Sequence, residues 1–238
     1  MAKKRKPMKA FTARLLARLS LITTEALVVG VLLWAALVVF FYLTRVVFVN
    51  KSATFDWWAF STLDTLRFAY PGLTSGVLVV TFFASMPFLV AAGILAPAGL
   101  LWRGYKREAW ELLWAVAGGS ILNQLLKIHY ERLRPDTALL PQAGLSFPSG
   151  HAMIGMTLYG CVAWLLWRHG HHPAWAAALL FWTFLIGCSR VYLHVHYATD
   201  VLAGFAAGLV WLILLRFALH LWERIVGVTI KDEVEAGK

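Results

Sequence analysis

The sequence predicts an all-α protein, a six-span transmembrane helical bundle. Of its 238 residues, 60% are hydrophobic and 14% are charged, whereas soluble domains average about 25% charged residues. Six stretches are long and apolar enough, or nearly so, to cross the hydrocarbon core of a bilayer, which takes about 20 residues of helix. They lack the alternation of barrel strands, and in lipid only helices and closed barrels satisfy their backbone hydrogen bonds. The predicted spans are residues 24–48, 75–102, 108–129, 150–168, 174–193 and 199–221.

The first span follows a basic N-terminal tail, residues 1–20. Seven of the 22 Lys and Arg residues lie in this tail. Its basic flank resembles that of a signal peptide, but the apolar run from Ala26 to Val49 is far longer than the ~7–15 residues of such a peptide's core, so we expect an uncleaved span. The net charge of +10 would suggest nucleic-acid binding. Its concentration beside an apolar run instead favours a membrane anchor and no nucleic-acid partner.

The remaining segments carry two further signals. The stretch between the first two spans contains Trp57 and Trp58, which suit either an interfacial amphipathic helix or an aromatic belt at the membrane surface. The third span is the least apolar of the six, because it carries Glu111, Asn123 and Gln124. Polar groups within a span are expected to face the interior of the bundle.

Six spans place both termini on the same side of the membrane. That side then carries 15 of the 22 Lys and Arg residues and the other side carries seven. The excess of cations predicts that both termini, and the basic tail, are cytoplasmic. No linker or internal repeat divides the chain, so we expect one domain over residues 1–238.

Three polar motifs interrupt this apolar chain. The first, Lys127 to Pro135, follows the third span. The second, residues 148–151 (Pro-Ser-Gly-His), opens the fourth span. The third, Ser189 to Asp200, joins the fifth span to the sixth. On the six-span map all three lie at the non-cytoplasmic face, and because ionisable groups at membrane depth are costly, their convergence there predicts a functional site.

The charges of this site favour an anion as its ligand. Three cations outnumber the one carboxylate, an excess that suits phosphate or sulfate and would repel a divalent metal. Ser149 and Gly150 begin a helix, where a serine can cap, a glycine lets the backbone approach a ligand closely, and the free N–H groups attract anions. The predicted phosphate-binding residues are Lys127, Arg134, Ser149, Gly150 and Arg190.

Three further residues are candidates for the chemistry. His196 and Asp200 are four residues apart, a spacing that on a helix puts both side chains on one face, where the carboxylate can orient the imidazole as a nucleophile. His151, one step inside the fourth span, is placed to protonate a leaving oxygen and later to activate water. This reaction transfers a phosphoryl group to His196 and then to water, and it requires no cofactor and no metal.

The three motifs resemble the signature of the type 2 phosphatidic acid phosphatase superfamily. That signature has a lysine six residues before Arg-Pro, then Pro-Ser-Gly-His, then Ser-Arg followed by a histidine and an aspartate. The match covers residues 127–200 closely and the six-span layout more loosely. It implies His196 as nucleophile, His151 as general acid, Asp200 as the orienting carboxylate and the other five residues as phosphate ligands. The chain then resembles a single-domain integral membrane lipid phosphatase of the bacterial inner membrane, with its site on the periplasmic side.

Other functions are compatible with the same residues. The site could pass the phosphoryl group to a second lipid instead of water, as a phosphotransferase, or the cations could select an anion or lipid in a transporter. The soluble haloperoxidases share these motifs, but six spans argue against them. His194, His196 and Asp200 could ligate zinc, although the neighbouring cations disfavour it.

Some polar residues of the motifs have ordinary explanations. A single Lys or Arg outside a span is usually an interfacial anchor, and a single interfacial histidine is more often structural than catalytic. We expect a structural or solvent-facing place, or a part in substrate choice, for four residues at variable motif positions: His129, Glu131, Arg132 and His194. The histidines at 169, 171 and 172 are expected in a solvated turn.

Overall fold

The computed structural model describes the backbone of residues 7–236 and the side chains of Thr24 and residues 26–223. All regular elements in this part of the chain are helical, which confirms the all-α prediction there. The first six residues of the basic tail lie outside the described residues. The elements are α1 (Pro7–Thr44), a π-helical turn η1 (Arg45–Val49), α2 (Thr54–Ala69), α3 (Leu73–Phe82), α4 (Met86–Trp102), α5 (Lys106–Tyr130), α6 (Gly150–Arg168), α7 (Pro173–Tyr192) and α8 (Ala198–Ala236).

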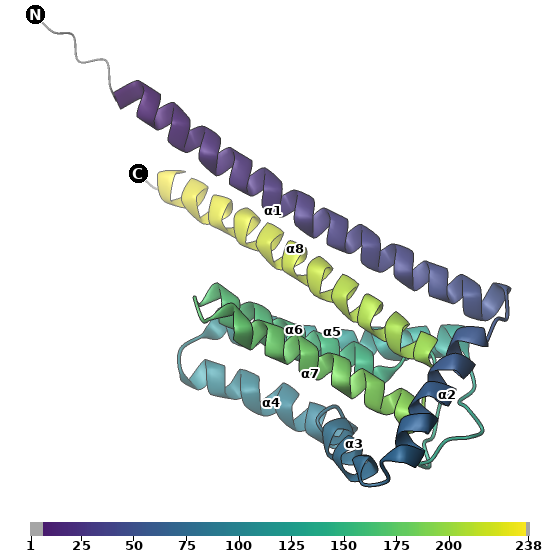
Figure 1. The fold of residues 1–238 in the computed structure, drawn as a ribbon. Coiled ribbons are helices and arrows are strands. Elements are labelled where there is room, and N and C mark those ends of the chain that lie inside the picture. The colour runs from purple at the N-terminus through teal and green to yellow at the C-terminus, as the bar shows by residue number, and fades with distance from the viewer. Residues whose placement is uncertain (1–6, 237–238) are drawn as a thin grey trace, which may run out of the picture.

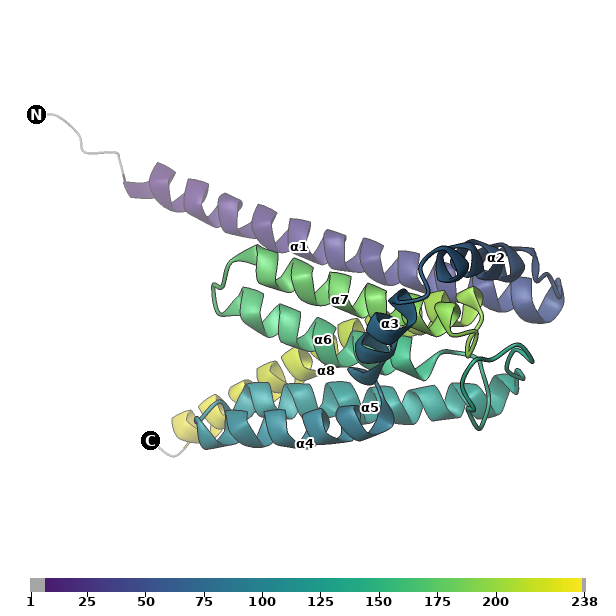
Figure 2. The ribbon, with the colours of Figure 1, turned by 60° about the horizontal axis from the view of Figure 1, so that its bottom comes forward.

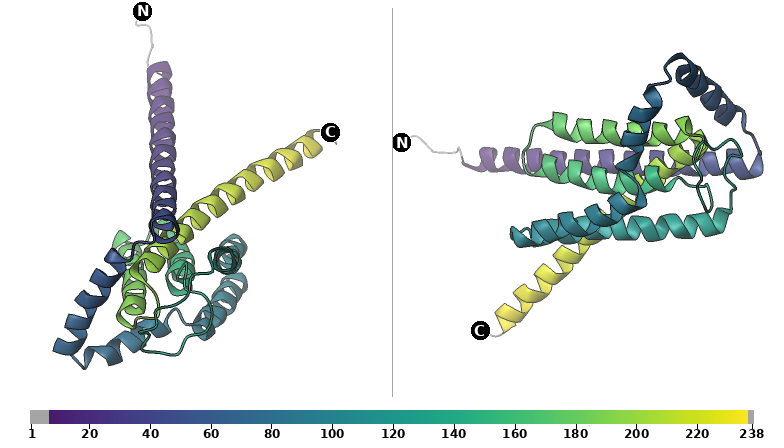
Figure 3. Two further views of the ribbon diagram at one scale, coloured as in Figure 1. Left: turned by 90° about the vertical axis from the view of Figure 1, so that its right-hand side faces the viewer. Right: turned by 90° about the horizontal axis from the view of Figure 1, so that it is seen from below.

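The long helices form a bundle around α6, which packs against α5, α7 and α8. The α4–α5 and α6–α7 connections lie at one end of the bundle (Figure 1, left). At the other end lie α2, the loop of residues 131–149 and the α7–α8 turn, and a second view shows the same division (Figure 2). Helix α1 packs along α8, and α8 diverges from the rest of the bundle toward its C-terminal end (Figure 3).

Two glycines bring α8 close to the start of α6. A Cβ at Gly204 would lie 2.8 Å from the carbonyl oxygen of Ser149, and one at Gly208 would lie 2.7 Å from that of Met153. The two glycines are four residues apart, so they lie on one face of α8, and small residues at this spacing let the backbones of membrane helices approach. The glycines therefore place α8 directly against the first turns of α6.

The predicted span 75–102 is interrupted. Helices α3 and α4 meet at a bend of 42°. Ser85 is extended, and Pro87 lies in the first turn of α4. Proline has no N–H to donate to the preceding turn, so it is favoured at a helix start, although α4 also contains Pro97 in its interior.

Fewer helices are apolar enough to cross a membrane than the six spans that the sequence predicts. Four helices of the described chain are long and apolar enough to cross a membrane, within Ala26–Val49, Gly150–Arg168, Pro173–Tyr192 and Ala198–Glu223, and α3 with α4 makes a fifth if the bent pair is one span. Helix α5, the predicted third span, is not among them, and the six-span count is therefore not confirmed. The polar residues noted in that span, Glu111, Asn123 and Gln124, lower its hydropathy.

Two of these three polar residues of α5 do face the interior of the bundle. Glu111 accepts hydrogen bonds from Arg216 and, at 3.4 Å, from Arg168. Asn123 is buried and donates to the carbonyl of Pro148. Gln124 is exposed, contrary to the prediction.

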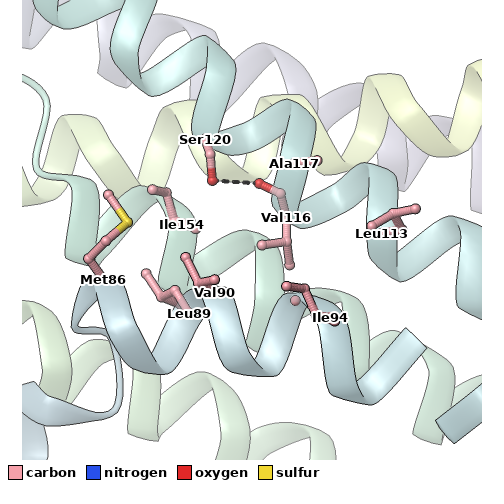
Figure 4. Close-up of a pocket in the computed structure, with 10 residues that line it drawn as sticks. Met86, Leu89, Val90, Ile94, Leu113, Val116, Ala117, Ser120 and Ile154 are labelled. Atoms are coloured by element: carbon pink, nitrogen blue, oxygen red, sulfur yellow. Dashed lines mark hydrogen bonds between the residues drawn. The ribbon is translucent and has the colours of Figure 1, made fainter. Parts of the chain in front are cut away.

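An apolar hollow of about 230 Å³ lies between α4, α5 and α6. Figure 4 shows side chains of α4, such as Leu89 and Val90, facing Val116 of α5 and Ile154 of α6. The only hydrogen bond drawn there joins the hydroxyl of Ser120 to the carbonyl of Val116. None of the predicted site residues lines this hollow.

Candidate active site

The three polar motifs meet at the end of the bundle that carries α2 and the 131–149 loop. The first motif contributes the end of α5 and the start of that loop. The second contributes the loop's end and the first turn of α6, and the third contributes the α7–α8 turn. Helix α5 ends where Glu131 takes a left-handed conformation with φ of 48°. That residue redirects the chain into the loop, which brings the motifs together.

His196 and Asp200 are paired, but not on one helical face as predicted. His196 lies in the turn before α8, which begins at Ala198, and Asp200 lies in the first turn of the helix. The Asp200 carboxylate accepts a hydrogen bond from the backbone N–H of Tyr197, at 3.0 Å. An acidic residue that binds the N–H at the helix start is part of a capping box. The cap, and not the helical repeat, holds the carboxylate 3.6 Å from Nδ1 of His196.

Ser146 bridges this pair. Its hydroxyl donates to Oδ2 of Asp200 at 2.5 Å and lies 3.3 Å from Nδ1 of His196. All three side chains are buried. Ser146 was not predicted as a site residue. Its position three residues before Ser149 was visible in the sequence, but nothing in that spacing indicates a contact with residue 196.

The contacts of His196 identify its free nitrogen. Arg134 donates to Val195 O, and its Nη1 lies 3.2 Å from Nε2 of His196. Because a guanidinium can only donate, Nε2 must be the unprotonated nitrogen, and Nδ1 carries the proton toward Asp200 and Ser146. Burial lowers the pKa of His196 to about 4, with Asp200 opposing the shift and the charges of Arg134 and Arg190 adding to it. The imidazole is therefore neutral at pH 7, with its lone pair on Nε2.

Two predicted phosphate-binding residues have unsatisfied polar groups. Arg190 is 2% exposed and donates through Nη1 to Thr81 of α3, at 2.8 Å. Within the part of the chain that the structure describes, its Nε and Nη2 atoms are buried without a hydrogen-bond partner, as is the hydroxyl of Ser149. Ser149 occupies the cap position of α6, but its side chain makes no cap hydrogen bond, contrary to the prediction. Buried donors are almost always satisfied, so these groups suit an anionic ligand with several oxygens.

The remaining predicted residues lie around this point. Lys127 donates to the carbonyl of Leu145, in the loop before α6. Gly150 lies against Asn123, whose side-chain oxygen would be 3.2 Å from a Cβ at position 150. His151 lies in the first turn of α6, close enough to His196 for electrostatic interaction, and Lys127, Arg134 and Arg190 also act on it. The structure thus brings all eight predicted residues to one site.

Of the four motif residues given ordinary explanations above, two take the structural alternative. Arg132 is not a solvent-facing residue: its guanidinium donates to Asp200 at 2.5 Å and to Asp56 of α2 at 2.9 Å. His194 is buried against α2, stacked on Phe60. His129 and Glu131 are exposed, as expected. The sequence does not predict Asp56 as a site residue, because an isolated acidic residue between Phe55 and Trp57 gives no indication of a partner.

The zinc alternative does not fit the geometry. His194 turns away from His196, and its ring nitrogens contact Asp64 and Thr137, each at 3.0 Å. In the described part of the chain no three His, Cys, Asp or Glu side chains form a group that could hold a metal ion. In the α6–α7 turn, which contains the other three histidines noted in the sequence, His169 lies 3.3 Å from Glu108.

Comparison with known proteins agrees with the motifs. Residues 108–223 match the model of the PAP2 superfamily. Phosphatidylglycerophosphatase B of Bacillus subtilis (strain 168) is 34% identical over 157 residues, which make up 61% of this chain and 75% of that protein.

Two solved structures share the fold. One is the crystal structure of the first transmembrane PAP2-type phosphatidylglycerolphosphate phosphatase from Bacillus subtilis, with a TM-score of 0.72 and 28% identity over 79% of this chain and 96% of that one. The other is Aquifex aeolicus LpxE, with a TM-score of 0.55 and 25% identity over 66% of this chain and 91% of that one. The resemblance predicted from the three motifs is confirmed, and the chain belongs to the PAP2 superfamily.

Proposed function

We propose that this protein is a membrane lipid phosphatase that hydrolyses a phosphomonoester or pyrophosphate of a lipid through a phosphohistidine at position 196. The observation that carries the proposal is the pairing of a neutral, buried imidazole with unsatisfied donors beside it. Nδ1 of His196 is committed to Asp200 and Ser146, and Nε2 is unprotonated. The free donors of Arg190 and Ser149 are available to phosphate oxygens.

In the bound state, the cations hold the phosphoryl oxygens and Arg134 exchanges its contact with His196 for one with the substrate. Guanidinium groups suit phosphate because their N–H groups can bind two oxygens at once. Lys127 adds a point charge, and the first N–H groups of α6 add the favourable end of the helix dipole. Removing the Arg134 contact frees the Nε2 lone pair to attack phosphorus.

The first chemical step transfers the phosphoryl group to His196. Nε2 forms a bond to phosphorus while the bond from phosphorus to the lipid oxygen breaks. His151, which the bound phosphate anion keeps protonated against the neighbouring cations, donates its proton to that oxygen. Asp200 and Ser146 stabilise the positive charge that develops on the imidazole. The cations stabilise the charge spread over the three remaining oxygens.

The second step restores the enzyme. His151, now neutral, removes a proton from water, whose oxygen forms a bond to phosphorus while the N–P bond breaks. The products are inorganic phosphate and unmodified His196. Because Lys127, Arg134 and Arg190 supply the positive charge, we expect the reaction to proceed without a metal ion or other cofactor.

The proposal includes six spans, cytoplasmic termini and a site at the periplasmic face of a bacterial inner membrane. Helix α5 has 25 residues, about 37 Å at 1.5 Å per residue, which exceeds the roughly 30 Å hydrocarbon core. Two of its polar side chains, Glu111 and Asn123, are buried in the bundle and not exposed to lipid. The distribution of Lys and Arg residues supports the orientation.

The substrate class follows from the relatives. The Bacillus subtilis relative is named for phosphatidylglycerol phosphate, both as a sequence and as a solved structure, so a lipid phosphomonoester of this kind is the first substrate to test. Purified protein in detergent would be given phosphatidylglycerol phosphate, phosphatidic acid and undecaprenyl pyrophosphate, with inorganic phosphate as the measured product.

We expect phosphate release that survives chelators, is inhibited by vanadate and is lost in His196→Ala. Brief reaction with radiolabelled substrate should trap an acid-labile label on the wild type and none on His196→Ala. Phosphate release that persists in His196→Ala, or that stops with a chelator, would contradict the mechanism. Label passed to an added acceptor lipid in place of water would identify a phosphotransferase.

A further inference from the structure

One arginine outside the phosphate-binding set joins two buried carboxylates. Nη1 of Arg132 donates to Oδ1 of Asp200 at 2.5 Å and to the hydroxyl of Thr199 at 2.8 Å. Nη2 donates to Oδ2 of Asp56 at 2.9 Å. Both carboxylates are 0% exposed. A buried carboxylate without a counter-charge is costly, so this single guanidinium stabilises both.

Asp56 is itself fixed by the start of α8. Its Oδ1 accepts the backbone N–H of Thr199 at 2.8 Å, and its Oδ2 accepts the Thr199 hydroxyl at 2.9 Å. The carboxylate of α2 therefore binds a free N–H in the first turn of another helix, where the helix dipole favours negative charge. Asp56 is in this way an anchor that ties Arg132 to the helix carrying Asp200.

Arg132 is also held on its other faces. Its guanidinium lies 3.9 Å from the centre of the Tyr197 ring, a cation–π contact. Its backbone carbonyl accepts the N–H of Ser146 at 2.7 Å. Ser146 is the residue that bridges Asp200 and His196. Arg132 thus reaches the pair twice, through its side chain and through its backbone.

These contacts give the two carboxylate oxygens of Asp200 different hydrogen-bond partners. Oδ1 is occupied by Arg132. Oδ2 accepts the Ser146 hydroxyl and the N–H of Tyr197, and it is the oxygen nearest Nδ1 of His196. With Oδ1 fixed, the carboxylate cannot rotate, and Oδ2 stays directed at the imidazole.

We propose that Arg132, anchored by Asp56, is a positioning residue that holds Asp200 and Ser146 in the orientation that His196 needs to act as nucleophile. Arg132 acts through those two residues and does not contact substrate. The proposal rests on the function proposed above. It makes α2 a part of the catalytic apparatus, because the anchor for a carboxylate of α8 comes from that helix.

The main test is Arg132→Lys, assayed for phosphate release from lipid phosphate. Lysine keeps the charge but lacks the planar fork that reaches Asp56 and Asp200 together. Small displacements of reacting groups cost about a hundredfold in rate, so we expect kcat to fall about tenfold to a hundredfold. KM should change little, because the phosphate-binding residues are untouched. Unchanged kcat in a folded variant would overturn the proposal.

The second variant, Asp56→Asn, keeps the shape of the anchor and removes its charge, so it tests the same contact if Arg132→Lys does not fold. We expect the same loss of kcat with little change in KM. The double variant should lose less than the product of the two single losses, because both remove one unit. If the loss of kcat in the double variant equalled the product of the two single losses, the two residues would act independently, contrary to the proposal.

Arg67→Lys is the matched control. Arg67 also belongs to α2 and donates to a residue of the third motif, the carbonyl of Tyr192, but its ion pair is with Asp64 and not with Asp200. We expect its kcat to equal that of the wild type. An equal loss in Arg67→Lys and Arg132→Lys would show that docking of α2 in general matters, and would overturn the specific role of Arg132.

Chemical rescue separates positioning from a merely structural role. Millimolar guanidinium chloride should restore part of the kcat of Arg132→Ala, since it can bind both carboxylates, whereas tetramethylammonium chloride should not. Equal effects of the two salts would count against the proposal.

Wild type and His196→Ala are measured in the same series. Absence of turnover by the wild type counts against the proposed function, while wild-type turnover with an undiminished Arg132→Lys counts against this inference.

Discussion

At the scale of single residues, the candidate site is centred on the imidazole of His196, whose two nitrogens have different environments. Nδ1 faces Asp200 and Ser146, and Nε2 faces Arg134. An arginine beside a neutral imidazole is unusual because it competes for the lone pair. In the proposed mechanism this competition ends when phosphate binds, which couples substrate binding to activation of the nucleophile.

Ser146 should matter for rate more than for binding. Removing its hydroxyl in Ser146→Ala deletes a hydrogen bond to a charged acceptor, which is worth about 1.5–3 kcal/mol, or about tenfold to a hundredfold in rate. We expect kcat to fall by that factor and KM to stay close to the wild-type value. Ser120→Ala is the control, because its hydroxyl bonds only the carbonyl of Val116 within α5. An undiminished kcat in Ser146→Ala would show that Asp200 acts on His196 without the bridge.

The pKa of His196 predicts how stability depends on pH. Burial lowers it to about 4, from about 6.5 in an unfolded chain. Between these values the unfolded chain binds a proton that the folded protein does not, so the free energy of unfolding falls as the pH drops from about 6.5 toward 4. His196→Asn removes this contribution. Its Tm should therefore fall less than the wild-type Tm between pH 7 and pH 4.5, and parallel Tm curves would contradict the prediction.

At the scale of elements, the active site depends on how closely two helices approach. Gly204 and Gly208 of α8 lie against the backbone of α6 at Ser149 and Met153. The start of α6 carries Ser149 and His151, while the start of α8 carries Asp200. Any change that separates these helices also separates His151, the proposed general acid, from Asp200, the carboxylate proposed to orient the nucleophile.

Gly208→Ala tests this packing. A Cβ there would lie 2.7 Å from a backbone carbonyl, which cannot move independently of α6, and overpacking of this kind costs about 1–3 kcal/mol. We expect a lower Tm together with lower phosphatase activity. Gly30→Ala in α1 is the control. No atom of the described residues lies within 4 Å of a Cβ there, and an alanine in a helix is favoured over glycine by up to about 1 kcal/mol. Equal Tm values for the two variants would contradict the close approach.

The amino-acid pattern of helix α2 does not predict that this helix contacts the candidate site. Its aromatic residues Trp57 and Trp58 are exposed, which suits an interfacial helix. The opposite face buries Asp56 and Phe60 against the α7–α8 turn. One face of the helix thus fits the membrane surface and the other holds the catalytic turn.

At the scale of the whole molecule, the arrangement places the site at one end of the bundle and the α4–α5 and α6–α7 connections at the other (Figure 1). Each helix from α5 to α8 runs between the two ends. With α5 counted as a span, the lipid phosphate is bound at one membrane surface while both termini lie at the opposite one. The position of α5 in the membrane therefore decides the topology.

Cysteine labelling tests the topology. In a Cys161→Ala, Cys188→Ala background, Arg103→Cys and Gln142→Cys flank α5 at its two ends, and both positions are exposed. A membrane-impermeant maleimide added to intact cells with a permeabilised outer membrane should label Gln142→Cys and not Arg103→Cys. After lysis both should react. Labelling of both positions in intact cells would contradict a membrane-crossing α5, and labelling of Arg103→Cys alone would invert the proposed orientation.

The candidate site could be located from the sequence because its residues stand in short motifs. Histidine, carboxylate and excess cations within residues 127–200 favour phosphate chemistry, which stays a prediction. The same local character made the all-α class predictable, since long apolar runs admit few structures in lipid. Proline alone does not locate the bend between α3 and α4, because Pro87 follows the bend whereas Pro97, in the same apolar run, lies inside α4.

Only the tertiary structure decided which groups complete the site. Asp56 and Thr199 are 143 residues apart in the chain, and Ser146 and Asp200 are 54 apart, so no periodicity or motif relates them. The sequence determined the helices and grouped the candidate phosphate-binding cations and candidate reacting histidines in short motifs, because these follow from composition and local pattern. Packing determined that Arg132 is shared by two buried carboxylates and that Ser146 joins Asp200 to His196, because hydrogen bonds across a bundle depend on distances that exist only once the helices have met.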